Sequence, residues 1–234
     1  IDPKTSTISV IIPTLNEAAN LAATLASLRG VAGVEVIVVD GGSSDRSVAL
    51  AEAAGVRVVV APVGRGRQQN QGAAVATGEI LLFLHGDTRL PTGFAEAVRA
   101  ALSRPGAVAG AFRLGIAGGG WGLRLVERLA NWRSRWLQMP YGDQGLFLRR
   151  PTFGALGGFP EQELMEDFEL VRRLRKRGHV ALLDLAVQTS PRRWQRLGVA
   201  RTTLVNQLVI TAYFFGVSPA RLAGWYRGAG GGSG

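Results

Sequence analysis

Short apolar segments alternate with helix-like segments through the first hundred residues of this chain, and this alternation constrains its fold most. The apolar runs predict strands, and the segments between them predict helices. The expected strands are Ile8–Ile12, Glu35–Val39, Val56–Val60 and Ile80–Leu84, and the expected helices are Glu17–Leu28, Asp45–Ala54, Gln68–Ala76 and Thr92–Leu102. Strands that alternate with helices predict a parallel, doubly wound α/β sheet. In such sheets, ligands bind beyond the carboxyl ends of the strands.

The second half of the chain changes character. It predicts strands at Ala107–Ile116 and Gly145–Arg149, and helices at Trp121–Leu137 and Asp167–Arg177. We expect one domain over residues 7–227, made of a nucleotide-binding half (7–104), an acceptor-side catalytic half (105–185) and a helical extension (186–227). Residues 1–6 and 228–234 resemble added or linker sequence and are expected outside the fold.

Charge and composition narrow the partners. The 234 residues include 27 Lys and Arg against 17 Asp and Glu, a net charge of +10 that favours nucleotides, phosphorylated acceptors, nucleic acid or an acidic membrane surface. The chain has no cysteine, which excludes disulfides, zinc ribbons and thiol nucleophiles. With only two histidines, any metal site rests on carboxylates, which suit Mg²⁺ or Mn²⁺.

An apolar segment near the C-terminus, Leu204–Val217, is interrupted by Asn206 and Gln207. It is shorter than the roughly 20 residues that a membrane-spanning helix needs. A helix docked on the core is favoured over one at a lipid interface, and peripheral membrane contact through this C-terminal helix stays the alternative. The lack of a signal peptide favours a cytoplasmic location.

The ends of the expected strands carry polar residues. The first strand leads into Pro13–Glu17 without the glycine-rich loop of a dinucleotide fold or a P-loop, so nicotinamide enzymes and P-loop kinases are disfavoured. The second strand ends at Asp40, before two glycines that a tight turn would also explain. Arg65 and Arg67 lie near the start of a helix and face either a diphosphate or solvent.

Asp87 follows the apolar run Ile80–Leu84, after His85 and Gly86. It is therefore expected at the edge of the sheet where ligands bind. A carboxylate there would hold Mg²⁺ or Mn²⁺ against the phosphates of a leaving nucleoside diphosphate, whereas the alternative is an ordinary turn. A single aspartate does not decide between the two, so the choice depends on the other motifs.

Four separated pieces of the chain together match one pattern. They are Val10–Glu17, Val38–Asp45, Leu82–Thr88, and Gly157–Pro160 leading to Glu166–Leu170. With these pieces in this order over residues 7–185, the chain resembles a family 2 glycosyltransferase of the GT-A fold. The resemblance implies an α/β fold with a Rossmann-like, mostly parallel sheet flanked by helices, a smaller acceptor-side subregion and C-terminal helices.

The resemblance also implies roles for individual residues. The family pattern puts the donor nucleotide against Pro13, Thr14, Leu15, Glu17, Asp40, Arg67, His85 and Gly86. Asp87 matches the last acid of the family's Asp-x-Asp motif and would be the metal ligand. Asp167 matches the catalytic base of inverting members, with Glu166 beside it. A helix N-terminus stabilises the ionised carboxylate that a base requires, although ordinary capping would also place acids there.

Two features depart from the family pattern. His85 replaces the first acid of Asp-x-Asp, which leaves the metal affinity open; in this His-x-Asp and in Tyr141–Gly145 the chain resembles a bacterial subgroup of the family. The Gln-x-x-Arg-Trp motif of processive synthases is two residues too long here, which disfavours polymer synthesis. Candidate diphosphate or acceptor contacts in these stretches are Asp143, Gln144, Arg192, Arg193 and Trp194. A basic surface loop explains the last three equally well.

The sequence thus predicts an inverting, metal-assisted glycosyltransferase that moves a sugar from a nucleoside diphosphate sugar, with uridine as the expected base, to an acceptor hydroxyl. Mn²⁺ or Mg²⁺ is the expected cofactor, the surplus arginines favour an anionic acceptor, and no nucleic-acid partner is expected. The alternative is a catalytically idle module of the same fold that binds a nucleotide or docks on a membrane or polyanion. A nucleotidyltransferase would need a glycine-rich, lysine-bearing loop where Pro13–Glu17 stands.

Overall fold

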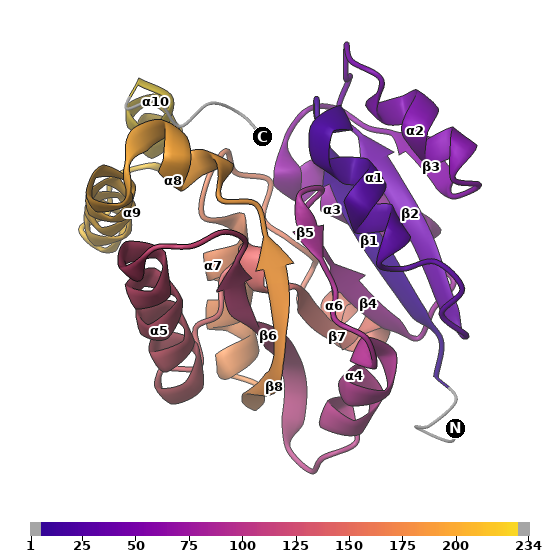
Figure 1. Cartoon of the computed structure of the whole chain (residues 1–234). Coiled ribbons are helices and arrows are strands. Elements are labelled where there is room, and N and C mark those ends of the chain that lie inside the picture. The colour runs from indigo at the N-terminus through magenta and orange to yellow at the C-terminus, as the bar shows by residue number, and fades with distance from the viewer. Residues whose placement is uncertain (1–5, 229–234) are drawn as a thin grey trace.

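An eight-stranded mixed sheet organises the computed structural model, which describes residues 6–228 (Figure 1). The strands are β1 (Ile8–Thr14), β2 (Val34–Asp40), β3 (Arg57–Val60), β4 (Ile80–Phe83), β5 (Thr88–Arg89), β6 (Ala107–Ile116), β7 (Leu146–Arg149) and β8 (His179–Thr189). The segments 1–6 and 228–234 were expected outside the fold. Of these, residues 1–5 and 229–234 lie outside the described residues. Ser6, by contrast, is buried and donates a hydrogen bond to Glu79.

The strands are ordered β3–β2–β1–β4–β7–β6–β8–β5 across the sheet. The first four run parallel, as expected for the nucleotide-binding half. β7 is antiparallel to both β4 and β6, β5 is antiparallel to β8, and β6 and β8 are parallel to each other. The sheet is therefore mostly parallel, in agreement with the expected fold class.

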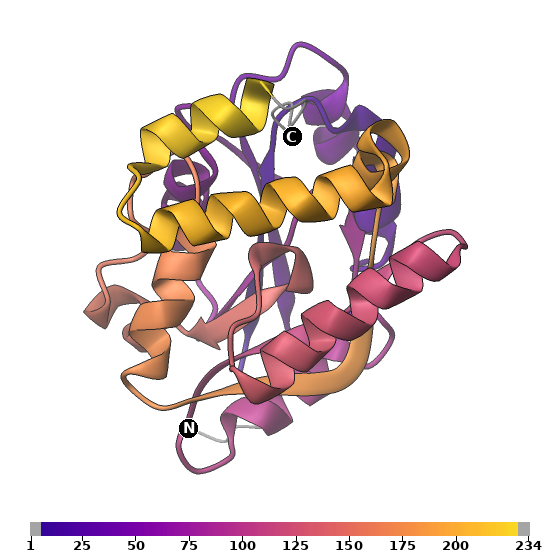
Figure 2. The same ribbon diagram turned by 90° about the vertical axis from the view of Figure 1, so that its left-hand side faces the viewer.

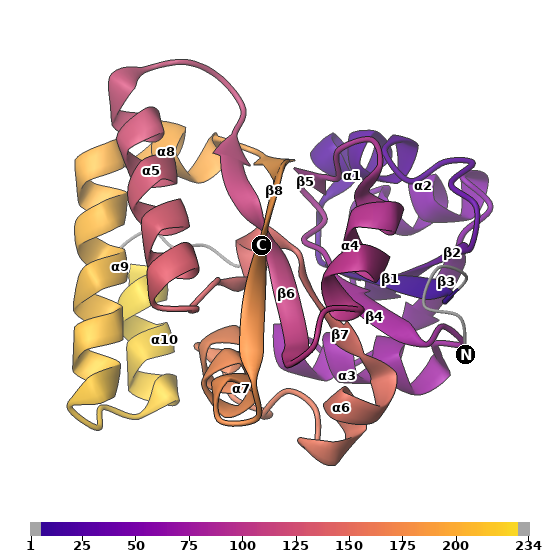
Figure 3. The same ribbon diagram turned by 90° about the horizontal axis from the view of Figure 1, so that it is seen from below.

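Helices cover both faces of the sheet (Figures 1 and 3). They are α1 (Ala18–Ala26), α2 (Ser47–Ala53), α3 (Arg65–Val75), α4 (Phe94–Leu102), α5 (Trp121–Trp136), the 3₁₀ turn η1 (Gly142–Gln144), α6 (Arg150–Ala155), α7 (Glu166–Arg175), α8 (Arg192–Leu197), α9 (Val199–Phe214) and α10 (Pro219–Gly228). α1, α2 and α4 share one apolar core with the sheet. α3, α6, α7, α9 and α10 contribute to a second core on the other face.

The apolar strands follow from this two-sided cover. Successive strand residues point to opposite faces, so Ile12 of β1 lies in the first core and its neighbour Ile11 in the second. Because both faces are buried, β1 and β4 are buried along their whole length. Gly72 lets α3 approach closely, since a Cβ at this position would overlap the side chains of Ile11 and Val39.

The C-terminal apolar segment and one strand need comment against the sequence expectation. The segment Leu204–Val217 falls largely in α9, which docks on the second core through Val209, as favoured from the sequence. Only Thr202 and Val209 of this helix are buried, so its opposite side is exposed, which was not expected. β8 was not anticipated, and it crosses the expected boundary at residue 185. Over residues 6–228, none of the helices has the length and apolarity to cross a bilayer.

Candidate active site

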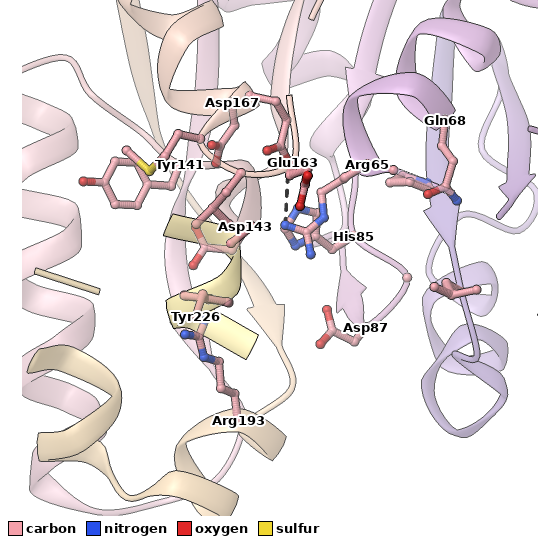
Figure 4. A pocket seen from close by; sticks show the side chains of 18 of the residues that line it. Arg65, Gln68, His85, Asp87, Tyr141, Asp143, Glu163, Asp167, Arg193 and Tyr226 are labelled. Atoms are coloured by element: carbon pink, nitrogen blue, oxygen red, sulfur yellow. Dashed lines mark ion pairs between the residues drawn. The ribbon is translucent and has the colours of Figure 1, made fainter. Parts of the chain in front are cut away.

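A cavity of about 800 Å³ lies at the carboxyl ends of β1 and β4, with the start of α7 and helices α8 to α10 on its other side (Figure 4). Most of the residues predicted from the sequence line it: Pro13, Thr14, Leu15, Glu17, Arg67, His85, Gly86, Asp87, Asp143, Glu166, Asp167, Arg192, Arg193 and Trp194. Motif pieces that lie far apart in the sequence therefore converge on one cavity.

Two of the predicted residues do not line this cavity. The carboxylate of Asp40 accepts hydrogen bonds from the N–H groups of Gly42 (2.8 Å) and Ser43 (3.0 Å), so it stabilises the turn after β2. The amide of Gln144 is fully buried and donates to the carbonyl oxygen of Phe112 at 3.0 Å. The polar atoms of both side chains are thus engaged in hydrogen bonds within the protein, Asp40 to its own turn and Gln144 to β6 and α5.

The turn Pro13–Glu17 is held by the loop that follows β2. Asn16 adopts a left-handed backbone conformation with φ of 55°, which asparagine tolerates better than most residues, and its side-chain oxygen accepts a hydrogen bond from the N–H of Ser44 at 2.9 Å. The N–H of Glu17 donates to Ser47 Oγ at 2.8 Å. The turn therefore presents a rigid edge to the cavity.

Gln68 ties the beginning of α3 to the same edge. Its buried amide Nε2 donates to the carbonyl oxygens of Thr14 (2.9 Å) and Val39 (2.8 Å), which end β1 and β2. One side chain thus joins a helix start to two strand ends. This part of the cavity wall is organised by buried hydrogen bonds to the backbone.

Arg65 and Arg67 diverge from the first turn of α3. Arg65 Nη1 lies 3.8 Å from Glu166 Oε1, and Figure 4 shows its side chain beside His85. Arg67 Nε instead lies 3.3 Å from Glu161 Oε2, and both of these side chains are more than half exposed. The family pattern implies a donor contact at Arg67, whereas the guanidinium of Arg65 is the one that reaches Glu166 in the cavity. Residues two apart point in different directions on a helix, which explains the difference.

His85 and Asp87 follow β4 and face the cavity (Figure 4). His85 Nε2 is buried without a hydrogen-bond partner. Burial, together with the charge of Arg65, lowers the pKa of His85 to about 3, so its imidazole is neutral at pH 7. Burial raises the pKa of Asp87, and the negative charge of Glu17 raises it further. A cation bound at Asp87 would relieve this unfavourable environment.

Strand pairing holds Asp87 beside the C-terminal segment. Thr88, the next residue, lies opposite Thr189 where the short strand β5 pairs with the end of β8. The N–H of Ser190 donates to the carbonyl oxygen of Asp87 at 3.1 Å. The chain that continues into α8 therefore starts directly next to the candidate metal ligand.

Two adjacent arginines of α8 reach the cavity from this side. Arg192 Nη2 donates to Glu17 Oε1 at 2.7 Å. Arg193 Nη2 donates to Asn206 Oδ1 at 3.0 Å, and its guanidinium lies 4.1 Å from the ring centre of Tyr226. Burial is the main reason that the pKa of Arg193 is lowered to about 10. Within the described chain no carboxylate forms an ion pair with Arg193, so an anionic ligand could neutralise it.

Glu166 and Asp167 begin α7 in different surroundings. They follow Met165, whose φ of 69° is unusual for a residue with a side chain. Asp167 accepts hydrogen bonds from the N–H groups of Gly142 (2.5 Å) and Phe168 (2.7 Å), which orient its carboxylate. Glu166 is 3% exposed, and burial together with the charge of Asp167 raises its pKa to about 7. Backbone N–H groups thus orient Asp167, whereas Glu166 is about half protonated at pH 7.

The turn η1 brings Asp143 to the same place. Its Oδ1 is buried without a hydrogen-bond partner, and burial raises its pKa to about 6. Gly142 leaves room for this approach, because a Cβ there would lie 3.0 Å from His85 Nε2 and 3.1 Å from Asp167 Oδ2. The backbone of η1 therefore fits closely between His85 and Asp167.

Tyr141, Asn206 and Tyr226 also line the cavity; Tyr141 lies in a stretch that the sequence singled out but was not expected as a contact, and the other two were not expected as site residues. The guanidinium of Arg133 lies 3.4 Å from the ring centre of Tyr141 and fixes this side chain. Asn206 and Tyr226 come from α9 and α10, whose position depends on packing against distant elements. A local pattern carries no such information, so only the excess of arginine in this region signalled a site.

Few side chains in the cavity could bind a metal ion together. The described residues include no group of three or more His, Asp or Glu side chains that could hold an ion. A Mg²⁺ or Mn²⁺ ion in a phosphate-handling site is typically held by one or two carboxylates, with the remaining ligands supplied by the substrate phosphates and water. Asp87, with a largely buried carboxylate that lines the cavity near Glu17, fits this arrangement.

Several solved structures resemble this chain in fold. A mannosyltransferase from Pyrobaculum calidifontis in complex with GDP-Man and Mn²⁺ superposes with a TM-score of 0.66 at 22% identity, over 94% of this chain and 68% of the other. Glucosyl-3-phosphoglycerate synthase from Mycobacterium tuberculosis, in complex with Mn²⁺, UDP and glucosyl-3-phosphoglycerate, gives 0.63 at 23% identity over 87% and 79%. S. aureus TarS in complex with UDP gives 0.64 at 19% identity over 83% and 63%. These similarities confirm the GT-A fold.

Curated relatives share part of the sequence. Uncharacterized glycosyltransferases of Mycobacterium tuberculosis and Mycobacterium bovis are 30% identical over 131 residues, which is 55% of this chain and 59% of theirs. The alignment thus spans less than two thirds of those proteins. The model of one family, described as glycosyl transferase family 2, matches residues 9–159. This match covers three of the four motif pieces and the start of the fourth, and we conclude that the chain belongs to glycosyl transferase family 2.

Proposed function

We propose that this protein is an inverting, metal-assisted glycosyltransferase that moves a sugar from a nucleoside diphosphate sugar, with uridine as the base, to an acceptor hydroxyl. One observation carries the proposal: a single cavity joins a group of carboxylates (Asp87, Glu166 and Asp167) to a group of arginines (Arg65, Arg192 and Arg193). A diphosphate needs cationic partners, and proton removal from a hydroxyl needs a carboxylate nearby.

The donor would occupy the space between the Pro13–Glu17 turn and the arginines. Arg193 supports this placement, because its guanidinium is largely buried and has no carboxylate partner among the described residues. His85 Nε2, neutral and unpartnered, can accept a hydrogen bond from the donor. Asp87 would hold Mn²⁺ or Mg²⁺, which when bound neutralises charge on the departing diphosphate. Similar solved proteins bind UDP or GDP-Man together with Mn²⁺.

The proposed base is Asp167. Its carboxylate is oriented by the N–H of Gly142 and lines the cavity, where it can take the proton of an acceptor hydroxyl. The acceptor oxygen would then attack the anomeric carbon on the side opposite the diphosphate, which inverts the configuration. Burial raises the pKa of Glu166 to about 7 and that of Asp143 to about 6, so both neighbouring carboxyls stay protonated to higher pH than ordinary acids do.

The acceptor is proposed to be anionic. Arg193 lines the cavity, and no carboxylate of the described residues forms an ion pair with it, so its guanidinium supports binding of an anionic group. We do not propose a nucleic-acid acceptor, because the arginines of this site line a cavity rather than an open groove. Product analysis with small phosphorylated or carboxylated acceptors would identify the class.

Calorimetric titration with UDP, in the presence and absence of Mn²⁺, tests the donor and metal together. We expect binding that Mn²⁺ strengthens at least about tenfold and that Asp87→Ala makes indifferent to the metal. Glu52→Ala, an exposed carboxylate on α2, is the matched control and should behave like the unmodified chain. Absence of UDP binding would contradict the proposed donor. Binding that does not depend on Mn²⁺ would contradict the proposed metal site.

Release of UDP from UDP-sugars by the purified protein separates an enzyme from an idle binding module. A glycosyltransferase slowly hydrolyses its donor when water replaces the acceptor, whereas a module that only binds the nucleotide releases none. A screen of UDP- and GDP-linked sugars, followed by mass spectrometry of the products, would identify the donor. No release with any donor, despite UDP binding, would support the idle module instead.

A further inference from the structure

The outward side of α5 carries a stripe of large apolar side chains. Trp121, Leu125, Leu129, Trp132 and Trp136 recur every three or four residues, so they share one side of the helix. Each of them is between 46% and 84% exposed. The opposite side of α5 packs in a small core with β6, so the stripe points away from the protein.

Helix α9 lies beside α5 and extends this surface. Figure 2 shows α5, α9 and α10 together as the outer layer of one side of the molecule. Leu204, Leu208 and Phe215, on or next to α9, are between 59% and 85% exposed. We call the following side chains the apolar face: Trp121, Leu125, Leu129, Trp132, Trp136, Leu204, Leu208 and Phe215. Exposed apolar patches of this extent mark interaction sites.

Positive charge borders the apolar face. Arg128 and Arg135 are exposed next to the stripe of α5. The single acid of α5, Glu127, is largely buried and paired within the helix. Asp184 of β8 is exposed and pairs with Arg135. Residues 192–228, which form α8, α9 and α10, contain no aspartate or glutamate; three of their arginines, Arg192, Arg193 and Arg196, line the cavity rather than this face.

This distribution of charge helps to decide whether a second copy of the chain or a membrane covers the apolar face. In a symmetric dimer the same patch of both copies meets, so the arginines of one copy would face those of the other, with few exposed acids to neutralise them. An anionic membrane offers the complementary charge. Tryptophan is the side chain that most favours the boundary between lipid headgroups and acyl chains, and arginine binds the phosphates there.

We propose that the apolar face docks on an anionic lipid bilayer, with α5 and α9 lying flat at the interface. None of the described helices could span the bilayer, so docking is peripheral. α9 also supplies Asn206, Val209 and Ile210 to the cavity, so the helix that meets the lipid is at the same time a wall of the cavity. The proposal rests on the surface alone and not on the reaction in the cavity.

Co-sedimentation of the full chain with vesicles tests docking directly. We expect vesicles of phosphatidylcholine with 30% phosphatidylglycerol to bind at least about tenfold more tightly than phosphatidylcholine alone, with loss of binding at high salt. The variant Trp121→Gln/Trp132→Gln/Trp136→Gln should lose at least about tenfold in affinity. Val60→Gln, at a site 74% exposed in the nucleotide-binding half, is the apolar control and should bind like the unmodified chain.

A charge reversal sharpens the assignment to this face. Arg128→Glu and Arg29→Glu change the net charge equally and both sites are exposed, but only Arg128 borders the apolar face. We expect Arg128→Glu to weaken binding about fivefold to tenfold and Arg29→Glu to have less than about a twofold effect. Equal effects would show attraction by net charge alone and would overturn the docking surface.

Folding and self-association are controlled in the same experiment. Circular dichroism and UDP affinity should be unchanged in the tryptophan variant, and the single variant Trp121→Gln, at the most exposed of the three tryptophans, should still weaken vesicle binding if the triple change disturbs α5. The proposal is overturned if the chain binds no vesicles, if the tryptophan variants bind normally, or if sedimentation velocity shows a dimer that these variants dissociate. UDP binding without vesicle binding would reject docking and leave the proposed function standing.

Discussion

The two walls of the cavity are held in place by different kinds of contact. On the side of β1 and β2, the side chains of Gln68 and Asn16 bond to backbone atoms, so the edge of the cavity is fixed before any ligand arrives. On the side of α8 to α10, Arg192 and Arg193 bond to the side chains of Glu17 and Asn206. Such contacts between side chains can exchange for a ligand with little change of the backbone. The first wall is organised for a constant group such as the nucleotide, and the second can adjust.

The largest expected effect comes from the acid between the two walls. Asp167→Asn should reduce kcat by about 10² to 10⁴-fold, because the amide keeps the shape but cannot accept the proton. UDP affinity should stay within about twofold, since we propose that the donor lies against the other wall. Rapid-quench or coupled UDP-release kinetics would measure the first quantity, and calorimetry the second. Retained turnover would reject Asp167 as the base.

A break in the rigid wall is expected to destabilise the fold. Gln68→Leu removes two buried hydrogen bonds and leaves the carbonyl oxygens of Thr14 and Val39 with fewer donors, so the free energy of unfolding should fall by about 1–3 kcal/mol. Urea denaturation would measure it. Gln71→Leu, exposed on the same helix, is the control and should change stability by less than about 0.5 kcal/mol. Similar values for both variants would contradict a rigid wall.

The buried acid beside the base should make stability depend on pH. The pKa of Glu166 is raised from 4.5 to about 7, so the unfolded chain ionises first and the folded state loses stability as pH rises from about 4.5 to about 7. Glu166→Gln lacks this loss. Its unfolding free energy relative to the unmodified chain should therefore increase by about 3 kcal/mol between pH 4 and pH 8, because one pKa unit corresponds to about 1.4 kcal/mol. Denaturant titrations at the two pH values would reveal it, and parallel pH profiles would speak against the raised pKa.

The smallest effect is expected at the adjustable wall. Arg192→Ala removes the ion pair with Glu17. Because the side chain of Arg192 is about half exposed, water screens this pair. We therefore expect donor KM to rise about twofold to fivefold, with little change in Tm. Arg177→Ala, exposed at the end of α7, is the control for loss of one positive charge. A collapse of the fold on loss of Arg192 would mean that this wall is as rigid as the other.

Much of the fold could be predicted because it depends on local patterns. The apolar runs of the first half mark β1 to β4 to within two residues, and β6 begins and ends where expected. β8 escaped prediction because Asp184 interrupts its apolar residues, and its pairing with β6 joins segments far apart in the sequence. The placement of α9 depends on what it packs against, so its exposed face was not foreseen.

In the candidate site, too, residues set by local patterns could be predicted and residues placed by tertiary packing could not. His85 and Asp87 were predictable because the carboxyl ends of parallel strands meet at one edge. Asp40 was expected at the donor for the same reason, but its carboxylate binds the backbone of its own turn. A strand-ending aspartate before two glycines serves either purpose, and no sequence pattern separates them. Tyr226 and Asn206 reach the cavity only through tertiary packing.

The pairing of β5 with β8 restricts where this chain can change in length. Thr88 and Thr189 lie opposite each other, next to Asp87 and three residues before Arg192. Because side chains alternate along a strand, one residue inserted within the paired part of β8 would turn the following side chains to the other face and carry Arg192 away from Glu17. The loop between β6 and α5 lies outside these strands, so we expect it to tolerate insertion better. Related chains can therefore differ in that loop, while the spacing from Thr189 to Arg192 is expected to stay constant.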